Sequence, residues 1–254
     1  MLAFLERKII GFVSQVGELA MLIWRLIRVL PLLVKNPHLT TEQMTFMGVN
    51  SLPLIILTSI FTGAVSSVQA AYQFRGIVPM RYLGTTVGKA VVIELGPVLT
   101  ALVVAGRVGA SIAAELGTMK VTEQIDALET MALDPVRYLV MPRFLAGITM
   151  LPVLTIFADF VAILGGLVVA VVAVDIAPYT FLNGVKLFFR LQDLFGGLAK
   201  SVAFGGIIAI VGCFQGFRTS GGAEGVGLST TRAVVLASIL ILLSDYFLAS
   251  MFFG

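Results

Sequence analysis

The chain has 254 residues, of which 58% are hydrophobic and only 12% charged, with a mean hydropathy of +1.03. A soluble domain of this length carries about twice that charged fraction, so the composition indicates an all-α integral membrane protein. One cysteine, Cys213, excludes an internal disulfide, and one histidine, His38, excludes a multi-histidine metal cage. The net charge of +3 is small and its bases cluster at segment ends, which argues against a nucleic-acid partner.

The first segment, residues 1–35, is predicted to be an amphipathic helix lying in the membrane interface. Polar or small residues recur there at steps of three, four or seven, as expected of one helical stripe: Arg7, Gly11, Ser14, Glu18, Arg25 and Arg28. A sixth transmembrane helix is the alternative, but it would bury four charged residues on one face. Pro31 and Pro37 then interrupt the chain.

The remaining segment, residues 36–254, is predicted to be a five-helix transmembrane domain. Its apolar stretches are residues 51–71, 90–114, 144–174, 196–217 and 233–253. Each reaches the roughly 20 residues needed to cross a bilayer. The third is too long for an upright span, so we expect it to tilt, to kink at Pro152 or to extend beyond the hydrocarbon.

The distribution of Lys and Arg predicts a cytoplasmic N-terminus. With that orientation ten of the 17 basic residues lie on the cytoplasmic side, five lie outside, and Arg107 and Lys200 lie within spans. A two-to-one bias favours this topology under the positive-inside rule.

Three charged residues within the spans, Glu94, Lys200 and Asp245, lie at similar predicted depths, roughly 6–12 Å below the outer boundary. Each costs about 2.5–3.5 kcal/mol at mid-bilayer, so we expect them to meet around a polar cavity. The alternative for Lys200 is a structural brace, in which it extends toward the surface and pairs with Asp245. The Gly96-Pro97 step predicts a helix break beside Glu94. No role is predicted for Asp159.

The second span also carries small residues spaced four apart, namely Ala105, Gly109, Ala113 and Gly117. Such a face allows another helix to approach closely. Packing within one subunit and contact between two subunits explain the pattern equally well.

The segment at about 118–131 is predicted to be a short amphipathic cytoplasmic helix that docks on a soluble partner. The alternative is a solvated loop helix. Its candidate contact residues are Lys120, Glu123, Gln124, Asp126, Leu128 and Glu129. Residues 221–227 form a glycine-rich stretch that predicts a flexible connection, with Ser229 or Thr230 capping the next helix.

Catalytic motifs are not found. Residues 84–90 read GTTVGKA, one residue short of a phosphate-binding loop and without its final Ser or Thr. Ser111 has no base, because His38 lies outside the spans. We therefore expect no enzymatic site and no cofactor.

Residues 94–129 read ELGPVLTALVVAGRVGASIAAELGTMKVTEQIDALE and closely resemble the signature of MlaE-type permeases. Asp134-Pro135, Pro142-Arg143 and Thr230-Thr231-Arg232 also resemble that family. The resemblance implies a homodimeric permease of an ABC transporter in the bacterial inner membrane, which moves phospholipids or related lipids. Its implied partners are a cytoplasmic ATPase dimer, which binds the ATP, and a periplasmic ring of MCE domains.

The resemblance also assigns roles to residues. The 118–131 helix corresponds to the coupling helix on the ATPase. Glu94, Lys200 and Asp245 correspond to polar positions of the lipid cavity, to which we add Pro97, Tyr72 and Gln69 as candidates. Ile93 departs from members that have a basic residue before the glutamate, so headgroup contacts are expected to differ. An intramembrane enzyme and a scaffold or channel are the competing classes, and co-purification with an ATPase separates the transporter from both.

Overall fold

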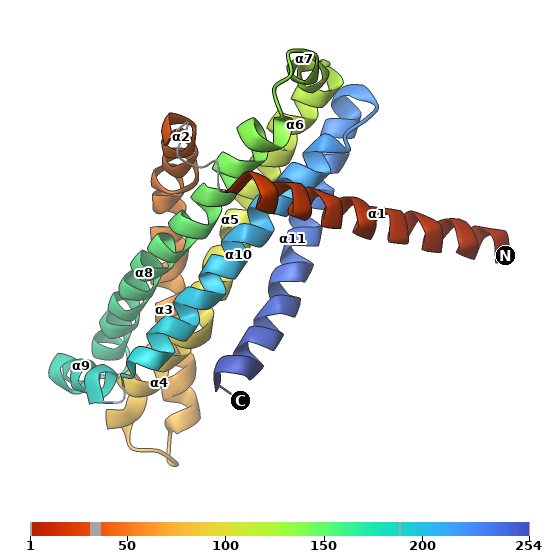
Figure 1. Cartoon of the computed structure of the whole chain (residues 1–254). Coiled ribbons are helices and arrows are strands. Elements are labelled where there is room, and N and C mark those ends of the chain that lie inside the picture. Colours follow the sequence, from red (N-terminus) through yellow and green to blue (C-terminus); the bar gives the residue numbers. More distant parts are fainter. Residues whose placement is uncertain (1, 31–36, 188, 254) are drawn as a thin grey trace.

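Helices are the only regular secondary structure in the part that the computed structural model describes, residues 2–30, 37–187 and 189–253. No strand occurs in these ranges, which confirms the predicted all-α class. The helices, shown in Figure 1, are α1 (Leu2–Val29), α2 (Pro37–Met47), α3 (Leu52–Phe74), α4 (Leu83–Ala90), α5 (Gly96–Val104), α6 (Ala110–Val121), α7 (Gln124–Thr130), α8 (Met141–Val172), α9 (Pro178–Leu187), α10 (Leu191–Phe217) and α11 (Gly222–Phe253).

Short helical turns of other kinds join several of these helices. Two are 3₁₀ turns, η2 (Val49–Ser51) and η3 (Met80–Tyr82). Three are π-helices, η4 (Val91–Leu95), η5 (Ala105–Gly109) and η6 (Val136–Val140). Because each π turn continues directly into an α-helix, long helical runs pass through them without a break in the chain direction.

Five helical runs are long and apolar enough to cross a membrane, which confirms the predicted number of spans in the described residues. They are Pro37–Phe74, Met80–Val121, Val136–Val172, Leu191–Phe217 and Gly222–Phe252. Each begins before the apolar segment that identified it, because helical geometry continues into flanking polar residues. The longest single helices, α8 and α11, have 32 residues and so extend about 48 Å, more than a bilayer's hydrocarbon thickness.

Helix α1 lies across the other helices, and its N-terminal half extends beyond the bundle (Figure 1). It is anchored near its C-terminal end, where Leu22, Leu26 and Val29 are buried in the main hydrophobic core. An ion pair between Arg218 Nε and Glu18 Oε2, 3.4 Å apart, ties it to the end of α10. Its position in the membrane interface stays a prediction. The side chains of Arg7 and Gly11, and the predicted domain boundary at 35/36 with Pro31, lie outside the described residues.

Small residues allow the spans to approach closely within one chain. A methyl group added at Gly147 of α8 would overlap the carbonyl of Gly205 on α10, and the reverse also holds. On the other side of α10, Gly212 and Gly216 pack against Ile112, Leu116 and the backbone of α6. Ala105, Gly109, Ala113 and Gly117 are all buried, and Gly109 and Gly117 face Ile208 and Thr219 of the same chain. The predicted small-residue face thus packs within the subunit.

Two loop predictions differ from the structure. Residues 118–131 are not one helix, because α6 continues to Val121 and α7 begins only at Gln124, with Glu123 between them in a left-handed conformation (φ 59°). The glycine-rich stretch is mostly helical, because α11 begins at Gly222, after a turn made by Gly221 at φ +87°. Ser229 therefore lies inside α11 and is hydrogen-bonded by the Thr219 hydroxyl at 2.9 Å instead of capping the helix.

The α8–α10 contact gives a stability prediction. Gly147→Ala should destabilise the folded chain by about 1–3 kcal/mol, because the new methyl group has no space beside Gly205. The matched control is Gly227→Ala in α11, where nothing lies within 4 Å of the added group. That change should be neutral or stabilising, since alanine favours a helix. Thermal unfolding in detergent compares the two, and equal midpoints would contradict the close contact.

Candidate functional site

Lys200 of α10 is fully buried and lies between two carboxylates from other helices. Its Nζ is 2.6 Å from Glu94 Oε2 on η4 and 2.8 Å from Asp245 Oδ1 on α11. We call these three residues the polar triad. The predicted meeting of two acids and one base is therefore observed, and it joins three elements that are far apart in sequence.

The backbone around Glu94 explains how the triad is held. In the π-helix η4, the amide of Gly96 donates to the carbonyl of Val91, five residues earlier. Pro97 has no amide hydrogen, so it cannot donate to the carbonyl of Ile93 as an α-helix would require. Lys200 Nζ lies 3.4 Å from that carbonyl oxygen and replaces the missing donor. The predicted helix break at Gly96-Pro97 is wrong: the proline produces a π turn and the helix continues.

A glycine on α10 brings Lys200 to this position. A side chain at Gly197 would meet the carbonyl of Val92, and Pro97 Cγ would lie 3.3 Å from its first carbon. Gly197 thus allows α10 to pack directly on η4. Because Lys200 follows three residues later on the same face, its amine reaches Glu94.

The triad is buried unevenly. The Lys200 side chain has no exposed surface and that of Asp245 is 12% exposed, whereas Glu94 remains 45% exposed. Removing one partner from a buried ion pair is strongly unfavourable, so Lys200 and Asp245 need each other. Glu94 instead presents a carboxylate at the surface of the single chain, where a bound molecule can reach it.

Asp159 of α8, which the sequence left unassigned, approaches the same region. It is 6% exposed, and its Oδ1 lies so close to Gly96 that a methyl group there would overlap it. That oxygen accepts no hydrogen bond from the described residues. The close approach of Asp159 therefore leaves room only for glycine at position 96.

The other predicted cavity residues are not joined to the triad within one chain. Pro97 is buried beneath Gly197. Tyr72 and Gln69 are exposed on α3, and neither hydrogen-bonds to the triad in the ranges that the structure describes. Their place in a lipid cavity stays a prediction.

The predicted docking residues lie at the end of the bundle that carries α7 (Figure 1). Lys120 Nζ pairs with Asp126 Oδ1 at 2.7 Å, which links α6 to α7 across their turn. Ile125 is buried and anchors α7, Leu128 is half-buried, and Glu123, Gln124 and Glu129 are exposed. The acidic side chains are accordingly available on the surface.

Two further ion or hydrogen-bond contacts hold this end together and were not predicted. Arg143 of α8 is buried, with Nη2 2.9 Å from Glu115 Oε2 on α6. Arg107, in η5, donates from Nη1 to the Ser51 hydroxyl at 2.6 Å. The sequence signal was present in Arg107, a charge within an apolar span, but its partner lies 56 positions earlier.

Five long spans and a charged cluster on three of them define the class of protein: a multi-pass membrane protein with the features of a transporter. Comparison with known sequences identifies the family. The family model described as Permease MlaE matches residues 40–251, so the chain belongs to the MlaE permease family.

Relatives agree with this assignment. A probable ABC transporter permease protein of Synechocystis is 46% identical over 218 residues, covering 86% of this chain and 83% of the relative. A probable ABC transporter permease protein of Rickettsia prowazekii is 43% identical over 224 residues, covering 87% of this chain and 86% of the relative. The intermembrane phospholipid transport system permease protein MlaE of Haemophilus influenzae is 35% identical over 254 residues. The match covers 98% of this chain and 96% of the relative. The family points to a transport subunit, not an enzyme.

The uneven burial predicts different effects of truncating the triad. Lys200→Ala should lower the free energy of unfolding by roughly 3–5 kcal/mol, because Asp245 is left buried and unpaired. Glu94→Ala should cost less than Lys200→Ala, because 45% of the Glu94 side chain is already exposed and Lys200 keeps its pair with Asp245. Thermal unfolding of the purified permease measures both.

The double variant Lys200→Met, Asp245→Leu is the control, because it replaces the buried pair by apolar groups. It should recover much of the stability lost in Lys200→Ala. If Glu94→Ala is the most damaging of these changes, the triad is held together differently from this description.

Proposed function

We propose that this chain is the permease subunit of an ABC transporter that moves phospholipids or related lipids between the bacterial inner membrane and the cell envelope. The observation that carries the proposal is the polar triad, a charged cluster within apolar helices that leaves one carboxylate accessible. The name of the Haemophilus influenzae relative, an intermembrane phospholipid transport permease, supports the choice of substrate.

The geometry suits an amphipathic substrate. Glu94 provides a charged acceptor beside apolar helix surfaces, so a polar headgroup and its acyl chains meet matching surroundings at one place. Lys200 holds that carboxylate in position from behind, through the 2.6 Å contact. Ile93 provides no charge next to Glu94, so the headgroup contacts on that side are apolar.

The proposed assembly has two copies of the chain, a cytoplasmic ATPase dimer that binds ATP, and a periplasmic ring of MCE domains. Helix α11 supports a second copy, because the part around Asp245 exposes large apolar residues, among them Tyr246, Phe247 and Met251. A copy packed beside α11 would enclose the exposed side of Glu94 and complete a shared lipid cavity. The N-terminus is proposed to be cytoplasmic, as the distribution of Lys and Arg favours.

Helix α7 is proposed as the contact with the ATPase. It is short, it is fixed to α6 by the Lys120–Asp126 pair, and Ile125 holds it against the bundle. An element held this firmly transmits movement of a docked partner to α6, and through α6 to the helices that carry the triad.

The lipid-path role of Glu94 can be tested in the assembled transporter. Glu94→Ala should reduce lipid transfer between liposomes roughly tenfold, the effect of losing one charge-assisted contact, while the ATPase still co-purifies. Glu42→Ala, which removes a carboxylate that is 60% exposed on α2, is the control and should transfer lipid normally. A photo-crosslinker at position 94 should capture phospholipid; normal transfer by Glu94→Ala with capture of protein alone would exclude this carboxylate from the path.

The ATPase contact can be tested by charge reversal. Glu129→Lys should weaken retention of the ATPase on the immobilised permease, because like charges placed at an interface can cost several kcal/mol. Glu129 is exposed and has no ion pair among the described residues, so the change should leave the fold intact. Lys186→Glu reverses a charge on α9, at the opposite end of the bundle, and should have no effect. Undiminished retention by Glu129→Lys would remove this surface from the interface.

A further inference from the structure

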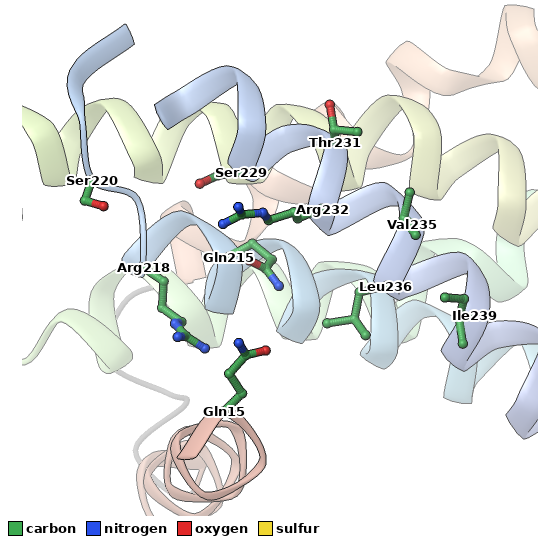
Figure 2. Close-up of a pocket in the computed structure, with 10 residues that line it drawn as sticks. All are labelled: Gln15, Gln215, Arg218, Ser220, Ser229, Thr231, Arg232, Val235, Leu236 and Ile239. Carbon is green, nitrogen blue, oxygen red and sulfur yellow. The ribbon is translucent and has the colours of Figure 1, made fainter. Parts of the chain in front are cut away.

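A second polar site lies at the other end of α11, in a pocket of about 610 Å³ between α1, α10 and α11. Figure 2 shows its side chains converging from the three helices, with Gln15 of α1 facing Arg218. Its lining residues are Gln15, Gln215, Arg218, Ser220, Ser229, Thr231, Arg232, Val235, Leu236 and Ile239. Nothing in the proposed lipid path through the triad uses these residues.

The polar part of the pocket is positively charged. Arg218 and Arg232 contribute two guanidinium groups, and no acidic side chain is among the lining residues. Arg218 is partly committed, because it pairs with Glu18 and lies 5.3 Å from the centre of the Phe214 ring. Arg232 makes no hydrogen bond or ion pair with the described part of the chain, so its donors are available for an anion. Guanidinium groups with neighbouring amides and hydroxyls are suited to phosphate oxygens.

The remaining wall of the pocket is apolar and extends along α11 in one direction from Arg232. Val235, Leu236 and Ile239 follow Arg232 along α11, toward the centre of the span, as Figure 2 shows. Arg232 and Ile239 are seven positions apart, which is roughly 10 Å of helix. Val235 and Ile239 are 53% and 57% exposed. A ligand that fits both parts has an anionic head and an apolar tail.

The position along α11 separates this pocket from the triad. Arg232 precedes Asp245 by 13 residues, so the two lie roughly 20 Å apart along the helix. In a hydrocarbon layer about 30 Å thick, that spacing places the two polar groups toward opposite leaflets. The pocket is at the end that carries α7, and α1 crosses the bundle beside it (Figure 1).

We infer that this pocket binds a phospholipid from the leaflet at the α7 end. Arg232 is the main contact of the phosphate group, and the apolar residues of α11 contact an acyl chain. The inference rests on the proposed lipid transport and adds to it, because it gives the permease a lipid position in each leaflet. A free phosphate ion shares the headgroup chemistry, and an ATPase side chain is the competing protein occupant. The apolar wall favours the lipid.

The test uses the assembled transporter in nanodiscs of phosphatidylethanolamine and phosphatidylglycerol. A photo-crosslinker replaces Leu236 in the pocket wall, and mass spectrometry measures the lipid adduct. We expect a phospholipid adduct that falls roughly tenfold in Arg232→Ala and largely returns in Arg232→Lys. Arg190→Ala, an exposed arginine at the other end of α10, should leave the adduct unchanged. A crosslinker at the exposed Phe160 of α8 should capture lipid independently of Arg232.

Three results would overturn the inference. A lipid adduct at 236 that does not depend on Arg232 would mean ordinary contact with bilayer lipid. An adduct abolished by added inorganic phosphate would assign the pocket to a soluble anion. Capture of the ATPase alone would make the pocket a protein contact.

Lipid transfer, measured in parallel, separates this inference from the proposed function. Absent transfer by the unmodified transporter, with an Arg232-dependent adduct, would remove the proposed function and leave the site. Normal transfer with an Arg232-independent adduct would remove only the site.

Discussion

The positive charge of Lys200, placed in the apolar interior of the bundle, sets the conditions that the surrounding helices must meet. A buried ammonium group is tolerated only when its charge and its donors are satisfied. Here Nζ donates to Glu94 and to the Ile93 carbonyl, and it forms an ion pair with Asp245. Each acceptor comes with a structural requirement. Glu94 and the Ile93 carbonyl need the π turn before Pro97, Asp245 needs α11 at the correct height, and α10 needs Gly197 to come near enough. A displacement of any one of these three elements therefore alters the contacts of Lys200 Nζ with the other two.

The sequence predicted the triad because the helix rise is constant: counting residues from a span's end gives depth, and charges at equal depth in hydrocarbon have a strong reason to meet. It did not predict how Glu94 is presented. The Gly96-Pro97 step is consistent with either a broken helix or a π turn. The π turn is favoured because Lys200 supplies the donor that Pro97 lacks, and Lys200 lies 103 residues after Pro97 in the sequence. Helix ends were similarly uncertain, because Glu123 gives no sign in sequence of its left-handed backbone (φ 59°).

The pocket beside α1 was beyond sequence reasoning for a different reason. Gln15, Arg218 and Arg232 come from three segments, and their meeting depends on where α1 crosses the bundle. Amphipathicity shows that a helix has a face to bury but does not show which span it crosses. The buried residues Leu22, Leu26 and Val29 and the Glu18–Arg218 pair hold α1 at that crossing. Neither Glu18 nor Arg218 stands out in the sequence as the partner of the other.

The π turns also change how this sequence should be compared with others. A π turn accommodates one residue more than an α turn, so the run from Met80 to Val121 contains three α-helical registers joined at η4 and η5. Spacings of three and four identify neighbours within 83–90, 96–104 or 110–121, but not between them. The four-residue step from Ala105 to Gly109 lies wholly inside η5, so it does not describe the same geometry as the step from Ala113 to Gly117. An alignment that places a one-residue gap within either π turn would preserve the packing of every helix around it.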